Sequence, residues 1–584
     1  MTTVVGPRHG PSLNTTARLA ALKPWPDFRP RLHHLVLLIL AAQFVTIGLI
    51  EASRDSATVD EAVDVASGIT IVARHDFRMN PEHGPLPKVL SALPAMLAHP
   101  IIPNDETYRD GAWFDYTDRF ISQNRAAGRL DNVLFLARTV AIAEGLTAAL
   151  LLYLFGRRLA GPWGGTVSAA LWLTTPVFIG FSHFAMIDIA FTVALLALSY
   201  RLLRFFDDPN PITAALCGVA CAAALLTRHN ALPIVGVVVV ATLIVSLRHS
   251  WRAALRNAAI VGLVVFGLVW LFYRGIDPTP PGGEIGQRFD AVIATAQHDS
   301  ITARAALTVP LPQEFRAGLG YLFVTSDDRP AYAFGHAWDG SRVWFFPAAA
   351  LAKLSFVVIG TCLAGLFCLR RVDGATRRSV MAALWLPTGA LGVMLLGQPL
   401  NLGLRYAFPI VAALFVVAAP AVLIGRVIVR RALGAAALGL QVMFVWMAAP
   451  HSLAWTPPPF TPAYRFVTDS NVDYGQDVEL FIRWAEQHQT AAAIVRARGF
   501  SLPASVQPLL GTAPAALDGW VAVSVTNLTA LHRDELSWLR AYCPVDSIGG
   551  SILLYYFDSP PDGAPGPTTP ARPCPAAAAA SHRS

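Results

Sequence analysis

The chain has 584 residues, of which 54% are hydrophobic and only 14% are charged, and its mean hydropathy is +0.48. A soluble protein of this length would carry about 25% charged residues, so the composition excludes an ordinary soluble enzyme and predicts a polytopic α-helical membrane protein. The net charge of +7 does not indicate nucleic-acid binding, because the arginines lie in short clusters between apolar runs, where the positive-inside rule places them.

The apolar runs predict about eleven transmembrane helices, each needing about 20 residues. They follow a basic leader over 1–34, which has no cleavable signal peptide and is expected to lie in the cytoplasm. The runs lie at 35–50, 132–155, 164–181, 187–203, 213–227, 231–247, 258–273, 344–368, 380–397, 406–425 and 432–449. Because the run at 213–227 is short, we expect Arg228 and His229 at its end to lie in an outward-open cavity below the membrane surface.

Arginine clusters in every second connection predict the orientation in a plasma membrane. They comprise Arg157 and Arg158, Arg201 and Arg204, Arg248, Arg252 and Arg256, Arg370, Arg371, Arg377 and Arg378, and Arg426, Arg430 and Arg431. These connections and the N-terminus are expected to be cytoplasmic. The loops 51–131 and 274–343 and everything after residue 450 are then extracytoplasmic.

The predicted domains are a transmembrane domain over 35–450, a small extracytoplasmic α/β domain over 451–558 and a disordered tail over 559–584, which is rich in Pro, Ala and Gly. Helical periodicity covers Val478–Gln487, and Trp520–Val525 and Ser551–Phe557 have the pattern of strands. Leu86–Ile102 is apolar but broken by proline, which favours a helix along the membrane interface.

Cys543 and Cys574 could form a disulfide or remain free thiols, while the other four cysteines lie in apolar runs and are expected to pack in the core.

Two acidic side chains, Asp60 and Glu61, follow the first crossing. Adjacent acids on an outer loop are usually solvated surface. Here they lie within a turn or two of the membrane edge, where partial desolvation and neighbouring charge would raise a carboxyl pKa and make a better general base.

A stiff turn follows at Asn80-Pro81-Glu82-His83-Gly84-Pro85-Leu86-Pro87-Lys88. Its prolines fix the backbone and present Glu82, His83 and Lys88. The alternatives are an ordinary capped loop, or a lysine that binds lipid head groups.

Ionisable residues at membrane depth form a third group. His183 and Asp188 flank a short outer turn, and such residues indicate function, although Asp188 could simply cap a helix. Arg138, Arg228 and Arg405 lie at or below the outer face. They need either buried partners such as Glu144 or Asp60, or a bound phosphate.

The segment Asp469–Asp477 is rich in oxygen ligands, but it lacks the glycine and the distal glutamate of an EF-hand, so we predict no metal there. It is either a helix start or part of an acceptor site, formed by Asp469, Asn471, Asp473, Gln476 and Asp477.

Together these motifs resemble the bacterial phospholipid-carrier-dependent glycosyltransferases of the GT-C superfamily, which include protein O-mannosyltransferases and lipid A aminoarabinose transferases. The resemblance runs from about residue 35 to 557, and it rests on the order and membrane side of Asp60-Glu61, the 80–88 turn, His183 with Asp188, Arg405-Tyr406 and Asp469–Asp477. It implies a GT-C fold, a polyprenyl-phosphate-sugar donor, inversion at the anomeric carbon and no metal or other cofactor.

By the same resemblance, Asp60 is the catalytic base and Glu61 its neighbour, Glu82 and Lys88 line the donor site, and Asp188 corresponds to a second acid. The sequence departs from the family in two places. Gly84 stands where proline often follows the histidine, and the Pro-rich segment Ala454–Phe460 replaces a Tyr/Phe-Asn element. Both bear on the acceptor more than on the donor.

The chemistry is consistent with these residues. A polyprenyl phosphate leaves as a monoester with a second pKa near 6 and needs cations rather than a general acid, whereas the acceptor hydroxyl needs a base. The expected partners are the lipid-linked donor, membrane lipids and a protein, lipid or glycan acceptor. The alternatives are a multi-pass transporter of a polar or lipid-linked substrate, which usually shows internal repeats that are not evident here, and a non-catalytic scaffold or sensor.

Overall fold

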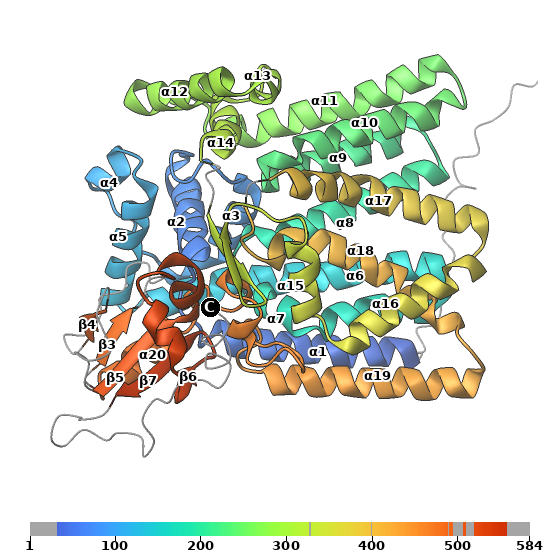
Figure 1. The fold of residues 1–584 in the computed structure, drawn as a ribbon. Coiled ribbons are helices and arrows are strands. Elements are labelled where there is room, and N and C mark those ends of the chain that lie inside the picture. Colours follow the sequence, from blue (N-terminus) through green and yellow to red (C-terminus); the bar gives the residue numbers. More distant parts are fainter. Residues whose placement is uncertain are drawn as a thin grey trace, which may run out of the picture.

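The computed structural model describes residues 32–325, 329–398, 400–488, 490–493, 506–509 and 519–557. The expected tail and nearly all of the leader lie outside these residues. A bundle of long helices makes up most of the molecule, and smaller elements gather at the end of the bundle opposite to the start of α1 (Leu32–Ala52) (Figure 1).

Within the described residues, eight helices, some of them with short 3-10 extensions, are long and apolar enough to cross a membrane, or up to nine if one bent pair is a single span. They are α1, α6 (Leu130–Leu173), α8 (Ile187–Asp207), α10 (Leu232–Leu247), α11 (Trp251–Ile276), α17 (Gly374–Gly397), α18 (Phe408–Val417) and α19 (Val427–Ala448). The bent pair is α15 (Phe345–Lys353) and α16 (Phe356–Cys368), with 114° between them. The remaining predicted crossing, α9 (Pro211–Thr227), has only 17 residues.

The long helix α6 contains a reversal of the chain. Ala160 and Gly161 leave the helical conformation, Gly161 with φ of 75°. A Cβ atom on Gly165 would lie 2.5 Å from the carbonyl oxygen of Tyr153, although twelve residues of straight helix span about 18 Å. The two arms therefore correspond to the predicted runs at 132–155 and 164–181. The total of eleven crossings stays a prediction.

The outside of the bundle is apolar. Leu38, Leu263, Val393 and Ile428 are 67%, 70%, 71% and 82% exposed. A soluble monomer rarely exposes so much apolar surface, so this surface fits lipid, and the helical membrane architecture predicted from composition is confirmed.

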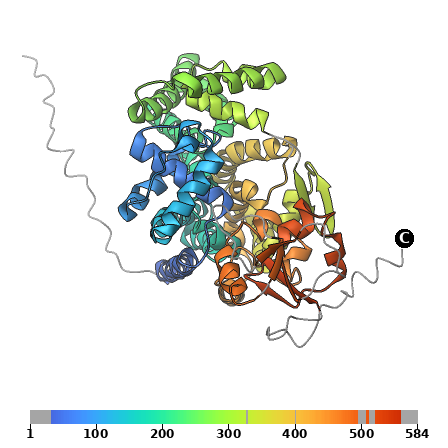
Figure 2. The same ribbon diagram turned by 90° about the vertical axis from the view of Figure 1, so that its left-hand side faces the viewer.

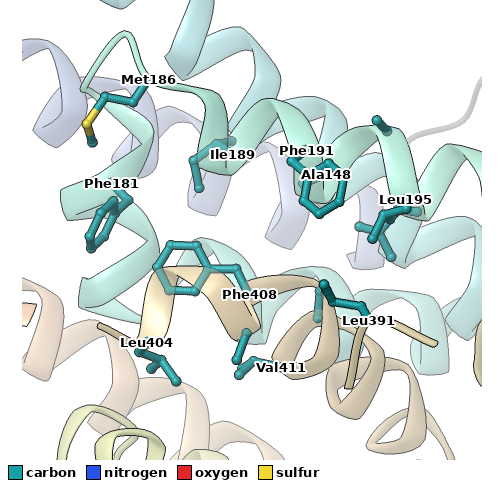
Figure 3. Packing of buried hydrophobic residues seen from close by; sticks show 14 of the residues in the cluster. Ala148, Phe181, Met186, Ile189, Phe191, Leu195, Leu391, Leu404, Phe408 and Val411 are labelled. Carbon is teal, nitrogen blue, oxygen red and sulfur yellow. The ribbon is translucent and has the colours of Figure 1, made fainter. Parts of the chain in front are cut away.

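Aromatic packing fixes the geometry near the end of the bundle opposite to the start of α1. Phe408 of α18 packs against Phe178 and Phe181 of α7 (Pro176–Ser182), with ring centroids 4.8 and 5.0 Å apart. Figure 3 shows Phe408 and Phe181 together with Ile189 of α8. This contact holds the residues before α18 close to the start of α8.

Short helices cover the end of the bundle opposite to the start of α1. They are α2 (Val59–Arg74), α3 (Pro85–Ala95), α4 (Glu106–Arg109), α5 (Trp113–Ala126), α12 (Gly283–Asp299), α13 (Ile301–Leu307) and α14 (Gln313–Val324), with a hairpin of β1 (Pro330–Ala333) and β2 (His336–Asp339). Helix α3 buries Lys88, Ala92 and Ala95 but exposes Leu90 and Leu93, as expected for a helix along the interface.

The C-terminal region is a small α/β unit beside these helices, as Figure 2 shows from the left-hand side of Figure 1. Its helix α20 (Val478–Ala485) and strands β5 (Gly519–Ser524) and β7 (Ile552–Phe557) lie where the sequence predicts them. With β3 (Thr490–Ala493), β4 (Val506–Pro508) and β6 (Asp546–Ile548) the sheet order is β4-β3-β5-β7-β6, parallel over the first three strands and antiparallel over the rest.

The cysteines largely follow the prediction. Cys543 is disulfide-bonded, and Cys574 lies outside the described residues. Cys217, Cys221 and Cys368 are buried free thiols, while Cys362 is partly exposed.

Candidate active site

Asp60 lies in the first turn of α2, at the end of the bundle that carries the short helices, and its carboxylate is held on one side only. Arg405 donates from Nη1 to Oδ2 of Asp60 at 2.8 Å, and the hydroxyl of Tyr474 donates to the same oxygen. The second oxygen, Oδ1, accepts no hydrogen bond from the described residues. The Asp60 side chain is 36% exposed and that of Arg405 is 7% exposed, so the free oxygen can reach a substrate.

Asp188 links two arginines next to Asp60. Its Oδ1 accepts from Nη2 of Arg228 at 2.9 Å, and its Oδ2 accepts from Nη1 of Arg405 at 3.3 Å. We call Asp60, Asp188, Arg228 and Arg405 the acid–arginine cluster. It unites residues far apart in sequence, from α2, the start of α8, the end of α9 and the 3-10 turn Leu404–Ala407.

Both arginines of the cluster keep unused donors. Nε of Arg405 is buried without a hydrogen-bond partner. Of the three side-chain nitrogens of Arg228, only Nη2 donates a hydrogen bond to a described residue. Their guanidinium groups lie over the rings of Tyr474 and Tyr406, each at 4.8 Å. An unpaired buried donor costs about 1–3 kcal/mol, so an oxyanion that reached these groups would relieve that cost.

The electrostatics of Asp60 correct one expectation. Burial acts to raise the pKa of Asp60, but the charge of Arg405 and the hydroxyl of Tyr474 lower it by more, so the pKa lies below its ordinary value. The prediction of a raised pKa was therefore wrong, because Arg405 pairs with Asp60, which was one of the two alternatives for the buried arginines. Asp60 is ionised at physiological pH and can accept a proton, but the lowered pKa makes its carboxylate a weaker base.

Lys88 stabilises the stiff turn instead of facing a ligand. Its Nζ donates to the carbonyl oxygens of Asn80 and His83 at 2.6 and 3.1 Å and lies 3.8 Å from Asp64. The side chain is 1% exposed, and burial lowers its pKa. The expected contact of Lys88 with a donor or with lipid head groups is not supported.

Glu82 and His83 of this turn are half-buried and lie within electrostatic reach of Asp60. Burial and the charge of Asp60 raise the pKa of Glu82. Burial, together with Lys88 and Arg228, holds the pKa of His83 well below its usual range. Both residues remain candidates for contact with a substrate.

Arg138 and Glu61 form a closed buried pair. Arg138 donates from Nε and Nη2 to the two oxygens of Glu61 at 2.8 and 2.7 Å, and its other N–H groups donate to three backbone carbonyls. Glu61 is fully buried and also accepts from Ala185 N. All donors of Arg138 are used, so the expected phosphate contact and the expected catalytic role of Glu61 are not supported.

His183 is also structural. Its ring lies between two carboxylates, with Nδ1 3.2 Å from Glu51 and Nε2 2.9 Å from Asp55, and it has no exposed surface. Burial acts to lower the pKa of His183, but the two carboxylates raise it to about 9. The expectation that His183 binds the donor is replaced by a role in joining the end of α1 to the turn before α8.

The segment 469–477 docks the C-terminal unit on the membrane part. Its polar side chains Asp469, Asn471, Asp473, Gln476 and Asp477 are all buried. Oδ1 of Asn471 accepts from Leu404 N at 2.9 Å, and Asp473 and Asp477 accept from the hydroxyls of Ser524 and Ser551 at 2.8 and 2.6 Å. These side chains are not open to an acceptor as expected.

Two residues were missed by sequence reasoning. Tyr474 lies inside the predicted segment, but no pattern connects it with Asp60, 414 positions earlier. Lys353 is buried and donates to the carbonyl oxygens of Leu453, Trp455 and Asn471 at 2.7, 2.6 and 2.9 Å. A lone lysine in the apolar run 344–368 was a signal that could have found it.

Comparison with known proteins gives one family match. Residues 129–272 match the family of dolichyl-phosphate-mannose-protein mannosyltransferases, and this region supplies Asp188 and Arg228 to the acid–arginine cluster. The match confirms the resemblance to membrane glycosyltransferases that the motifs indicated. No curated protein matches the chain.

Solved structures with a related arrangement are distant. They include AglB, the oligosaccharyltransferase of Archaeoglobus fulgidus, in complex with an inhibitory peptide and a dolichol-phosphate (13% identity, 91% of this chain and 75% of that chain, TM-score 0.42). They also include ArnT from Cupriavidus metallidurans bound to undecaprenyl phosphate (12%, 88% and 97%, 0.30) and the Pmt1-Pmt2 complex of S. cerevisiae bound to the sugar donor (18%, 55% and 40%, 0.33). The chain spans 55% of the length of the archaeal enzyme in its apo form. At these scores none of them carries the argument that follows.

Proposed function

We propose that the chain transfers a sugar from a polyprenyl-phosphate-sugar donor to an acceptor hydroxyl on the outer face of the membrane. The observation that carries this proposal is the acid–arginine cluster, because it places a half-exposed carboxylate beside two buried arginines with unused donors. A base and an oxyanion site side by side are what displacement of a phosphate from a sugar carbon requires.

Arg228 and Arg405 would hold the donor phosphate. Guanidinium groups suit phosphate because their planar donors match its oxygens. As the bond between C1 of the sugar and the phosphate oxygen breaks, its electron pair stays on the phosphate, and the two arginines stabilise the added charge. This charge stabilisation needs no metal, so the proposal includes none.

Asp60 would act on the acceptor. Its free Oδ1 accepts the proton of the acceptor hydroxyl while the hydroxyl oxygen forms the new bond to C1. A single displacement of this kind inverts the configuration at C1. The products are the glycosylated acceptor, the polyprenyl phosphate and a protonated Asp60, which then returns its proton to water.

A direct test incubates the purified chain with a radiolabelled polyprenyl-phosphate sugar and a membrane extract as the source of acceptor. We expect label in the acceptor and release of polyprenyl phosphate. Arg228→Met should raise the KM for the donor at least tenfold, because it removes a charged hydrogen-bond partner.

The control variant is Arg109→Met, which removes an exposed arginine of the outer helices and should leave the KM unchanged. Uptake of an unmodified solute into sealed vesicles, with no transfer of label, would favour the transporter instead.

A further inference from the structure

A further role is indicated for Tyr474, a residue of the C-terminal unit whose side chain contacts the acid–arginine cluster. Tyr474 is 2% exposed. Its hydroxyl donates to Asp60, and its ring lies 4.8 Å from the guanidinium carbon of Arg405. The same side chain therefore contacts both the carboxylate and the arginine that pairs with it.

The backbone around Tyr474 fixes the position of this side chain. Val59 N donates to the carbonyl oxygen of Tyr474 at 3.3 Å, and Ser56 N donates to that of Gln476 at 2.8 Å. The segment thus runs along the start of α2, one residue away from Asp60. On its other side the segment is held by two hydrogen bonds. Asp473 accepts from the hydroxyl of Ser524 in β5, and Asp477 accepts from the hydroxyl of Ser551 just before β7.

We propose that Tyr474 is a positioning residue for the transfer reaction: together with Arg405 it holds Oδ2 of Asp60, so that Oδ1 faces the acceptor hydroxyl. The C-terminal unit then completes the active site instead of only covering it. This inference rests on the proposed function, since it assigns Asp60 to the acceptor.

Holding one carboxylate oxygen of Asp60 fixes the direction of the other. An aspartate with neither oxygen held can rotate about its terminal torsion, which has a broad minimum. Arg405 restrains Oδ2 from one direction, and the hydroxyl of Tyr474 restrains the same oxygen from a second direction. Loss of one hydrogen bond to a charged group corresponds to about a 10- to 100-fold effect.

The test compares Tyr474→Phe with Tyr555→Phe in the full-length chain. Both substitutions remove one hydroxyl from a buried tyrosine of the C-terminal region, but Tyr555 lies in β7. We expect kcat to fall about 10- to 100-fold for Tyr474→Phe, with an unchanged donor KM and a melting temperature close to that of Tyr555→Phe. In the pH profile of Tyr474→Phe, the loss of activity on the acidic side should move to higher pH, because the hydroxyl that lowers the pKa of Asp60 is lost.

A second measurement does not depend on activity. Infrared difference spectra between each tyrosine background and the same background with Asp60→Asn isolate the carboxylate band of Asp60. We expect this band to shift in the Tyr474→Phe background and not in the Tyr555→Phe background. An unshifted band, or a Tyr474→Phe enzyme with wild-type kcat and pH profile, would overturn the inference. If the wild type transfers no sugar while the band shifts as expected, the proposed function fails and the contact of Tyr474 with Asp60 stands.

Discussion

Two adjacent carboxylates have opposite environments in this protein. Asp60 is half-exposed and keeps one oxygen free, while Glu61 is fully buried and bonded to Arg138. Successive residues of a helix are about 100° apart around its axis, so Asp60 faces the acid–arginine cluster and Glu61 faces the core. The sequence could locate the pair but could not decide which arginine joins which acid.

The pair of Arg138 and Glu61 predicts a stability effect without a direct catalytic one. Arg138→Met leaves Glu61 charged and unpaired in the core, which costs about 3–5 kcal/mol. We expect a clear drop in the melting temperature of the purified protein. Any folded fraction should keep the donor KM of the wild type. A stable Arg138→Met protein with a raised donor KM would instead return Arg138 to the phosphate site.

His183 predicts a decline in stability at alkaline pH. Its pKa is about 9 in the folded chain against 6.5 ordinarily, because the carboxylates of Glu51 and Asp55 outweigh the burial. A raised pKa contributes stability that is complete below about pH 6.5 and is lost as the pH rises through about 9. The melting temperature should therefore fall between pH 7 and 10.

In the control variant His298→Gln, which changes an exposed histidine, the melting temperature should fall with pH as steeply as in the wild type. In His183→Gln the melting temperature should depend less on pH. An equally steep slope in His183→Gln would assign the alkaline transition to other groups.

At the scale of elements, close packing of the stiff turn explains the departure at Gly84. A Cβ atom on Gly84 would lie 2.2 Å from the carbonyl oxygen of Leu226, the residue two before Arg228. Only glycine lets the turn come this close to the end of α9. The proline common in the family at this position would collide with that backbone.

Gly84→Ala should therefore displace the end of α9 together with Arg228. We expect a raised donor KM and a loss of stability of about 1–3 kcal/mol. Gly262→Ala, where the added methyl group meets open space, is the matched substitution and should change neither quantity. Wild-type kinetics in Gly84→Ala would show that the turn and α9 can separate freely.

Most elements were predictable because they follow from local patterns. Long apolar runs predicted the long helices of the bundle, and the segments Trp520–Val525 and Ser551–Phe557 predicted strands β5 and β7. The short apolar helix α9 was also predicted, but Arg228 at its end is buried against Asp188, where the sequence had suggested an outward-open cavity. What the sequence could not provide were the pairings: Lys88 with backbone carbonyls, His183 with two acids, and Tyr474 with Asp60. Such contacts depend on which helices become neighbours, and no local pattern encodes that.

At the scale of the whole molecule, the proposed transfer requires the acid–arginine cluster to lie on the outer side of the membrane. The structure places the cluster, the short helices and the C-terminal unit at the same end of the bundle, opposite to the start of α1 (Figure 1). The arginine-rich connections predict that the other end faces the cytoplasm.

A membrane-impermeant maleimide tests this orientation in intact cells. We expect Asp115→Cys, at an exposed position of α5, to react from outside. His249→Cys, in an exposed turn between α10 and α11, should react only after the membrane is opened. The reverse pattern would place the active site in the cytoplasm.

The proposed transfer depends on Asp60 taking the proton of the acceptor hydroxyl, and removal of this carboxylate is a sharp test of that role. Sugar transfer from a radiolabelled polyprenyl-phosphate donor is measured for the wild type, Asp60→Asn and the exposed-site control Asp115→Asn, with donor binding measured in parallel. We predict that Asp60→Asn lowers kcat by about 10²–10⁴-fold while donor binding persists, and that Asp115→Asn behaves as the wild type. A kcat for Asp60→Asn close to that of the wild type would contradict the account.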